Sequence, residues 1–508
     1  MKKILTYLLV AVLAAVGCKK DNYSETFDEQ VTDFMEEVFW NQTGEPDAEV
    51  ISKEILTPDE MAAFIFGADG TLDDTEREMK KKFMDECAEA QAEFLNENSD
   101  QPNAKIAFET QNIKYRTKGE EGRSSIELSA FIAYAVYPVS PYGPYDFETF
   151  DAKNIIFCCP YTHTLEKECA TENRGGKEFA TMWAQNLFIM PDGEGFGVDK
   201  NHTQTYLNHE LHARQYYDAM KAGIWYYVHE GGKSGGKFKD GWKMRVTGAS
   251  QGAGDAIAFH KYLDTHSQQL NISKYYDAGY RSFAEALCKK YGYPAGSLYV
   301  EVPLCDVHRF DYSVVCCGPY CPEVTMQTYS KWGGMSYPCV IPLVIKSMLA
   351  CYPKELPYKE EDFFSGTWNQ NKAELDKIYL EKTMASDELN YYLCDVLLPK
   401  GTNSTSIGLH YILSGNMCDE NSQIYQDLMA CLKKQDLTTG WTPRTKTKIY
   451  FSENDEVVPY ENTQCLGRLL KATNTQYLMV DCSKIWPGIA SGHVATCAQF
   501  FLLEIGTY

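Results

Sequence analysis

The sequence predicts an α/β fold in which a mainly parallel sheet is covered by helices on both faces. Two short apolar runs, at residues 155–157 and 187–189, are typical of strands buried inside a parallel sheet. A helical pattern follows over residues 203–222. A further strand ends in Gly248-Ala249-Ser250-Gln251-Gly252, and another helical pattern begins directly after it. Strands and helices that alternate in this way indicate parallel strands joined by crossover helices.

The first eighteen residues predict an export signal. Lys2 and Lys3 precede an apolar stretch over residues 4–16, which is too short to span a bilayer. The stretch ends in Ala15-Val16-Gly17-Cys18, which resembles a bacterial lipobox; the alternative is an ordinary secretory signal with a chance cysteine. We expect residues 1–18 to be a lipoprotein signal peptide with Cys18 as the lipidation site. The mature protein would then be an exported bacterial lipoprotein, periplasmic or on the cell surface, held to the membrane by its N-terminal lipid anchor.

Composition excludes some partners. The formal net charge of −22 argues against a nucleic-acid partner, because a phosphate backbone attracts basic surfaces. The chain has 18 cysteines without a Cys-x-x-Cys pair, so we expect no structural metal site. An oxidising compartment would permit some disulfides, and residues 305–339 are dense enough in cysteine to hold one. Their connectivity and the oligomeric state stay open.

Residues 19–104 are predicted to form a helical extension. They are acidic and polar, and Val31, Phe34 and Val38 mark a short amphipathic face. Residues 75–95 have the pattern of a longer charged helix. No chemistry is visible here, so we interpret the segment as a tether followed by helices that pack on the main domain.

The rest of the chain is predicted to form one core with an insertion. Residues 105–324 contain the first part of the core, which starts with an antiparallel hairpin, shown by alternating apolar residues. Residues 325–445 lose strand periodicity and become helical and polar, as a lid or cap would. Residues 446–508 close the core. The further strands are expected at residues 298–304, 310–317, 448–451 and 477–480.

Ser250 is the candidate nucleophile. A strand, a Gly-x-Ser-x-Gly turn and a helix are the context of a nucleophile elbow, in which the turn is so tight that the residues two before and two after the serine must lack bulk. The strain presents the serine oxygen, and the N–H of Gln251 points into an oxyanion site. The pattern alone is weak, because a glycine-rich turn with a bystander serine would look the same.

Two further residues make the pattern specific. Asp455 lies in a polar loop after the strand at 448–451, and His493 opens the last helix, after the final strand. Acyl transfer by serine needs a base and a carboxylate that orients the base. Alone, Asp455 could be an Asx turn and His493 a helix-start histidine. Together with the elbow they follow the chain order Ser, Asp, His of this sheet architecture.

On these residues the chain resembles an α/β-hydrolase, and more specifically the secretory lipase family and its bacterial lipoprotein relatives. The similarity is collinear over roughly residues 110–508. Two departures are that residues 160–164 lack the usual glycine and that the N-terminal 90 residues have no counterpart. The matching motifs are Pro191-Asp192-Gly193, Ala213-Arg214 with Asp218, Gly248 to Gly252, Gly318-Pro319-Tyr320, Asn454-Asp455 with Val458-Pro459, and Gly492-His493.

The resemblance implies a serine esterase or lipase that needs no cofactor. Ser250 would attack the carbonyl of a small-molecule ester, His493 would carry the proton and Asp455 would orient His493. The oxyanion would be held by the N–H of Gln251 and by an N–H near His163. A metal at the neighbouring histidines is not expected, because His209-Glu210-Leu211-His212 does not have the zincin spacing.

Two other functions stay open. An exported serine peptidase would share the triad, and acidic groups such as those at residues 360–362 would then hold the free amine of its substrate. A catalytically inactive, lipid-anchored binding protein on the same fold is the second alternative, although an intact triad argues against it.

Overall fold

The computed structural model describes residues 27–67, 69–97, 105–138, 147–176, 184–276, 279–402, 404–485 and 492–504. The predicted signal peptide and Cys18 lie outside these residues. The described residues divide into two compact units, one drawn from residues 27–42 and 269–301 and the other from residues 43–268 and 302–504. No helix within the described part combines the length and apolarity that crossing a bilayer requires.

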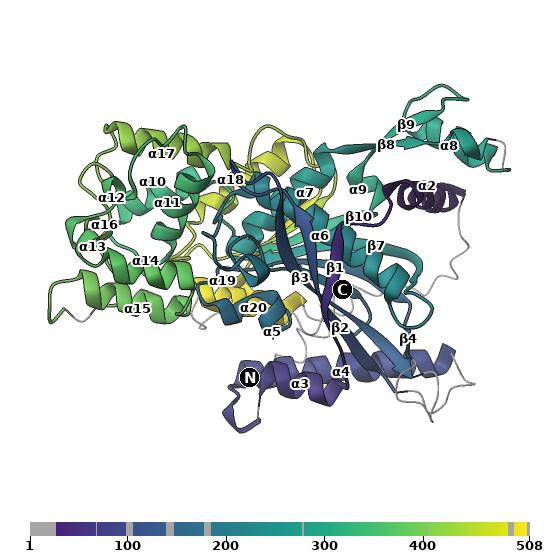
Figure 1. The fold of residues 1–508 in the computed structure, drawn as a ribbon, viewed down its shortest axis with the longest axis horizontal. Coiled ribbons are helices and arrows are strands. Elements are labelled where there is room, and N and C mark those ends of the chain that lie inside the picture. The colour runs from purple at the N-terminus through teal and green to yellow at the C-terminus, as the bar shows by residue number, and fades with distance from the viewer. Residues whose placement is uncertain are drawn as a thin grey trace. The chain divides into compact units, whose positions relative to one another are not determined.

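A ten-stranded sheet forms the centre of the larger unit (Figure 1). Strands β6, β5, β7, β10, β11 and β12, in this spatial order, pair parallel with their neighbours. Strands β1, β2 and β3 pair antiparallel, and β3 also pairs antiparallel with β6. The mainly parallel sheet predicted from the sequence is therefore confirmed. The strands are β1 (Ala48–Leu56), β2 (Ala107–Thr117), β3 (Ile126–Pro138), β4 (Phe147–Thr149), β5 (Ala152–Cys159), β6 (Leu187–Pro191), β7 (Phe238–Ala249), β10 (Phe310–Cys316), β11 (Lys446–Phe451) and β12 (Tyr477–Asp481).

Helices cover both faces of this sheet. In β5 the side chains alternate, so Phe157 meets Tyr216 of α6 (His209–Glu230) and Phe259 of α7 (Gln251–Thr265), with ring centroids 5.8 and 4.7 Å apart. Its neighbour Ile156 belongs to the core on the opposite face. The helices that contribute to that core are α3 (Pro58–Phe66), α4 (Asp74–Glu97), α5 (Ala170–Asn173), α19 (Cys482–Ile485) and α20 (His493–Glu504).

The stretch predicted as a cap is helical and has a core of its own. Figure 1 shows its helices gathered together in green. Trp368, Leu389 and Leu428 are fully buried within it. Isolated β-bridges are the only β-structure described between β10 and β11. The helices are α10 (Pro322–Trp332), α11 (Val340–Cys351), α12 (Glu360–Phe363), α13 (Gly366–Gln370), α14 (Lys372–Glu381), α15 (Ser386–Leu397), α16 (Leu409–Ile412) and α17 (Gln423–Lys434).

The smaller unit is organised by aromatic packing. Phe34 of α2 (Phe27–Thr43) lies between Tyr275, at a ring distance of 5.1 Å, and Phe283 of α8 (Arg281–Lys290), at 5.9 Å. The chain enters and leaves this unit through β8 (Ser267–Asn271) and β9 (Tyr299–Pro303), which pair with each other. The strand expected at residues 298–304 therefore exists, but it is not part of the central sheet.

Two further expectations differ from the structure. Residues 48–56, in the predicted helical extension, form the edge strand β1, which the cross-strand ion pairs of Lys53 with Glu109 and of Glu49 with Lys114, each 2.7 Å long, hold to β2. Such pairs join residues distant in sequence, so the local pattern does not show them. The disulfide considered for residues 305–339 is absent too, since every cysteine in the described part of the chain is a free thiol.

Candidate active site

Ser250 occupies a strained turn between β7 and α7. Its φ of 54° and ψ of −125° lie in a region that non-glycine residues rarely adopt. A Cβ atom on Gly248 would lie 2.1 Å from the carbonyl oxygen of Gly252, and one on Gly252 would lie 2.3 Å from the carbonyl oxygen of Cys159. Both positions therefore exclude any side chain, which is the steric requirement that the sequence pattern predicts for an elbow.

The structure brings Ser250, His493 and Asp455 together in one hydrogen-bonded triad. His493 Nε2 lies 2.9 Å from Ser250 Oγ, and His493 Nδ1 lies 2.8 Å from Asp455 Oδ2. A carboxylate can only accept, so in the neutral imidazole Nδ1 carries the proton and donates to Asp455, while Nε2 can accept from the serine hydroxyl. The other oxygen of Asp455 accepts from the N–H groups of Val457 and Val458 at 2.9 and 2.7 Å, which fixes the carboxylate.

The surroundings of His493 favour its charged form. Burial opposes the charge, but Asp455 and Cys497 raise the pKa of His493 well above its usual value of 6.5. The backbone N–H of His493, at the start of α20, donates to Glu456 at 3.1 Å. An acidic side chain at a helix start is favourable, so Glu456 also anchors the helix that carries the imidazole.

Two thiols beside His493 were not predicted from the sequence. Cys497 lies one helical turn after His493, with its Sγ 4.0 Å from Nε2. Donor atoms of Cys317, Asp455 and His493 lie within 4.8 Å of one another, and no other described group of side chains would suit a metal ion in this way. The i, i+4 spacing of residues 493 and 497 is the signal that could have revealed the first thiol. Cys317 comes close to Asp455 and His493 because of where β10 ends in the sheet. No local pattern in the sequence indicates this proximity.

Three hydroxyl–imidazole–carboxylate triads occur in the described part of the chain, and accessibility separates them. In the second, Thr205 Oγ1 lies 3.0 Å from His212 Nε2, and His212 Nδ1 lies 2.9 Å from Asp255. Thr205 is 1% exposed, so no substrate can reach it.

The third triad is equally closed. Ser313 Oγ lies 2.8 Å from His260 Nδ1, and His260 Nε2 lies 3.0 Å from Asp264. Ser313 and His260 are completely buried. Ser250 is partly exposed and lines a cavity. Among these triads, only that of Ser250 has a hydroxyl-bearing residue that is partly exposed and lines a cavity.

The cavity at Ser250 is apolar. Leu207, Met326 and Ile341 contribute to its wall, with Met326 and Ile341 coming from the helices α10 and α11. Val457 and Val458, next to Asp455, line it as well. No charged side chain is part of the lining. The cavity therefore suits an uncharged, hydrocarbon-like group bound beside the serine hydroxyl.

The loop proposed to carry the second oxyanion donor begins beside the elbow. The carbonyl oxygen of Pro160 lies 2.7 Å from the place that a Cβ on Gly252 would take. His163 itself is buried against Tyr161 and Phe196, and burial lowers its pKa to about 3. Its side chain is therefore neutral at ordinary pH. The backbone N–H near His163 stays a prediction for the oxyanion donor.

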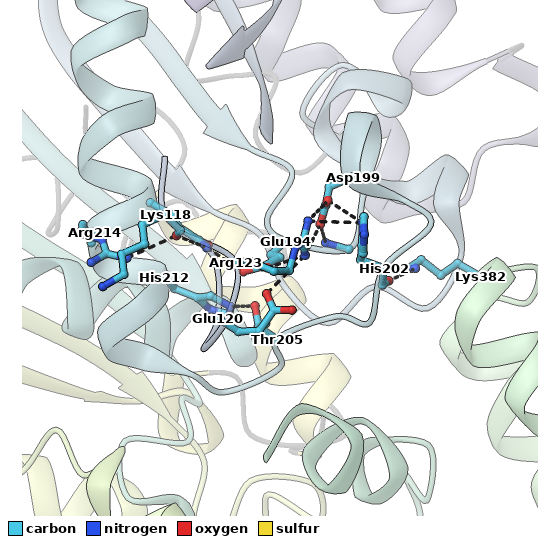
Figure 2. A network of polar contacts seen from close by, with 12 residues as sticks. Lys118, Glu120, Arg123, Glu194, Asp199, His202, Thr205, His212, Arg214 and Lys382 are labelled. Carbon is cyan, nitrogen blue, oxygen red and sulfur yellow. Dashed lines mark hydrogen bonds and ion pairs between the residues drawn. The ribbon is translucent and has the colours of Figure 1, made fainter. Parts of the chain in front are cut away.

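The histidines considered for a metal have separate partners. His202 pairs with Asp199 at 2.8 Å, His212 with Asp255, and His209 Nδ1 lies 2.9 Å from the carbonyl oxygen of Gln435. Figure 2 shows His202 and His212 at different places in the polar network, with Lys382 of the cap reaching the backbone of His202. These histidines do not converge on one point, as metal ligands would.

The same network explains the acidic loop after β6. Arg123 donates to Glu194 at 2.7 Å and to Asp199 at 2.5 Å (Figure 2). Asp192 is buried and accepts from Ser129 at 2.5 Å and from the Thr171 hydroxyl at 2.6 Å. These carboxylates are engaged in holding the loop to β3 and its neighbours, so they shape the fold and do not form an acid–base pair.

Comparison with known proteins yields structural similarity but no sequence match. Neither family profiles nor curated proteins match the chain. The fold is similar to that of LipA, a rice cell wall degrading esterase from Xanthomonas oryzae. In its ligand-bound form LipA is 18% identical, with a TM-score of 0.56, covering 90% of this chain and 97% of LipA. It is also similar to a protein from Legionella pneumophila to which a hydrolase activity has been attributed. That protein is 14% identical, with a TM-score of 0.57, covering 91% of this chain and 96% of the other. With the mainly parallel sheet and the helices on both faces, these similarities confirm that the chain has the α/β-hydrolase fold.

Proposed function

We propose that this protein is a serine hydrolase that cleaves carboxylic esters through an acyl-enzyme. The observation that carries the proposal is the contact of 2.9 Å between Ser250 Oγ and His493 Nε2 at the edge of an apolar cavity. Proteins of the same fold include an esterase, LipA, which supports this reaction class without specifying the substrate.

The proposed reaction has two halves. Ser250 Oγ attacks the ester carbonyl while its proton passes to His493 Nε2, and Asp455 stabilises the imidazolium that forms. The tetrahedral oxyanion accepts from the N–H of Gln251, the first residue of α7, and from an N–H near His163. His493 returns the proton to the leaving alcohol. Water then repeats the sequence on the acyl group, which releases a carboxylic acid and restores Ser250.

The cavity favours an ester over a peptide with a free amine. A peptidase that held such an amine would need an acidic group close to the serine, and the described lining has none. Glu360, considered for that role, pairs with Lys346 at 2.7 Å and with Lys372 at 3.4 Å. Glu360 is therefore engaged in ion pairs within the cap. The serine peptidase remains the alternative for the same triad.

The location of the protein is part of the proposal. We propose that the chain is exported and anchored through a lipid on Cys18, so that its small-molecule ester substrate lies outside the cytoplasm. The support is the lipobox-like sequence at residues 15–18. Incorporation of a labelled fatty acid into the wild type, and its loss in Cys18→Ser, would test the anchor.

The test of the activity is hydrolysis of p-nitrophenyl esters from acetate to palmitate, with Ser250→Ala as the control. We expect turnover that is lost in the variant, and the preferred chain length separates an esterase from a lipase. A fluorophosphonate should label the wild type at Ser250. Labelling without ester turnover would favour the peptidase. Neither labelling nor turnover would favour a catalytically inactive, lipid-anchored binding protein.

A further inference from the structure

Two cysteines outside the triad lie side by side where the cap begins. Cys321, at the start of α10, is 6% exposed, and Cys465 is half-buried on α18 (Glu461–Ala472). Each thiol influences the pKa of the other, which places the two side chains close together. The backbone around them is held in place, because the N–H of Cys321 donates to Asn462 Oδ1 at 2.8 Å. Asn462 also donates to the hydroxyl of Thr325 in α10, again at 2.8 Å.

The surroundings of Cys465 favour a thiolate. Asn462, Cys465 and Arg468 are three residues apart on one side of α18. The guanidinium of Arg468 donates to Cys465 Sγ at 2.9 Å. The neighbouring thiol of Cys321 lowers the pKa of Cys465 to about 7 against the effect of burial, and the charge of Arg468 acts in the same direction as that thiol. A partly exposed thiol beside a cation is the environment of reactive cysteines.

We propose that Cys465 and Cys321 form a redox-sensitive pair, in which Cys465 is the attacking thiolate and Cys321 the resolving thiol. With oxidised glutathione as the oxidant, Cys465 Sγ attacks one glutathione sulfur and releases one glutathione thiolate. Cys321 then loses its proton to that thiolate and attacks Cys465 Sγ, which releases the second glutathione. The balance is two protein thiols and one glutathione disulfide giving one protein disulfide and two glutathione thiols.

The bridge would join the cap to the segment that follows Asp455. Helix α10 supplies Pro322, Thr325 and Met326 to the cavity at Ser250, and α18 begins six residues after Asp455. A disulfide here closes a long loop, which restricts the unfolded chain strongly. We expect oxidation to raise the midpoint of thermal unfolding by roughly 5 °C. The pair is independent of the proposed esterase activity.

The first test compares two thiols within the wild-type protein. Cys418 is the exposed thiol of the cap, and burial of its sulfur raises its pKa. At pH 7 we expect iodoacetamide to alkylate Cys465 at least threefold faster than Cys418, although Cys465 is less exposed. Arg468→Gln should remove that advantage. Equal or slower alkylation of Cys465 in the wild type would overturn its assignment as the attacking thiol.

The second test identifies the bridge itself. Full-length protein is treated with oxidised glutathione, alkylated and digested with trypsin without reduction. We expect a disulfide that joins the peptides 310–331 and 449–468 and that is lost in Cys321→Ser. The first peptide also contains Cys316 and Cys317, so a bridge that persists in Cys321→Ser would contradict the pairing. A stable glutathione adduct on Cys465 without any bridge would overturn the role of Cys321.

Discussion

His493 Nε2 lies 2.9 Å from Ser250 Oγ, although the two residues are 243 positions apart in the sequence. The fold creates this contact by ending β7 in the elbow that carries Ser250 and by starting α20 at His493. Asp455, at 2.8 Å from Nδ1, sets which nitrogen of the imidazole carries the proton.

Replacing Asp455 by asparagine should lower kcat for p-nitrophenyl butyrate by about 10⁴ with little change in KM. An amide at this position can donate to Nδ1, which favours the tautomer that cannot accept the serine proton. The matched control is Asp264→Asn, the same change in the buried triad of His260. We expect that variant to be less stable but active. Similar losses of kcat in both folded variants would contradict the role of Asp455.

The rate should rise with pH through an inflection above 6.5. Only the neutral imidazole can accept the serine proton, and the pKa of His493 is raised, so the acid limb of kcat/KM moves to higher pH. Cys497 contributes to that increase. In Cys497→Ala the inflection should therefore lie at lower pH. A matched control is Cys394→Ala, in α15 of the cap. An inflection at the same pH in Cys497→Ala and the wild type would exclude an influence of this thiol on His493.

The sequence predicts the elbow well because all its determinants are local. A Cβ atom on Gly248 or Gly252 would lie 2.1 or 2.3 Å from a backbone carbonyl oxygen. The two glycines in the sequence therefore already indicate the tight turn. The order of Ser250, Asp455 and His493 along the chain follows from strands that end at one edge of the sheet. These residues were therefore identifiable before their contacts were known.

Contacts across the fold were not predictable in the same way. The strand β1 depends on ion pairs with β2, as in Lys53 with Glu109, which no local pattern contains. The thiol of Cys317 reaches Asp455 and His493 only because β10 lies next to β11 in the sheet. The sequence also does not distinguish Ser250 from Thr205 and Ser313 by exposure, which the packing decides.

Gly252→Ala should destabilise the protein and reduce activity. The added methyl group would meet the carbonyl oxygens of Cys159 and Pro160 at 2.3 and 2.7 Å, and backbone atoms cannot move aside as a flexible side chain can. Overpacking of this kind costs about 1–3 kcal/mol in the free energy of unfolding. Gly415→Ala is the control, because nothing lies within 4 Å of its added Cβ. Denaturant titration should show a lower midpoint for Gly252→Ala alone. Equal midpoints for the two variants would mean that the backbone at Cys159 shifts readily to make room for the added methyl group.

Glu194 should make stability depend on pH. Burial, and then the hydrogen bond with Glu120, raise the pKa of Glu194 to about 8, against 4.5 in an unfolded chain. Between these values the folded protein holds a proton that the unfolded chain has lost, so the stability from this group is complete below pH 4.5 and is lost as pH rises through 8.

Glu194→Gln keeps the neutral form at every pH and can still accept from Arg123. We expect the variant to match the wild type at pH 5 and to melt about 3 °C higher at pH 8.5. The matched control is the exposed Glu210→Gln, which should follow the wild type at both values. Thermal unfolding by circular dichroism measures the difference. The opposite result would be a lower melting temperature for Glu194→Gln than for the wild type at pH 8.5. It would mean that the attraction between the charged Glu194 carboxylate and Arg123 stabilises the fold by more than burial of that charge destabilises it.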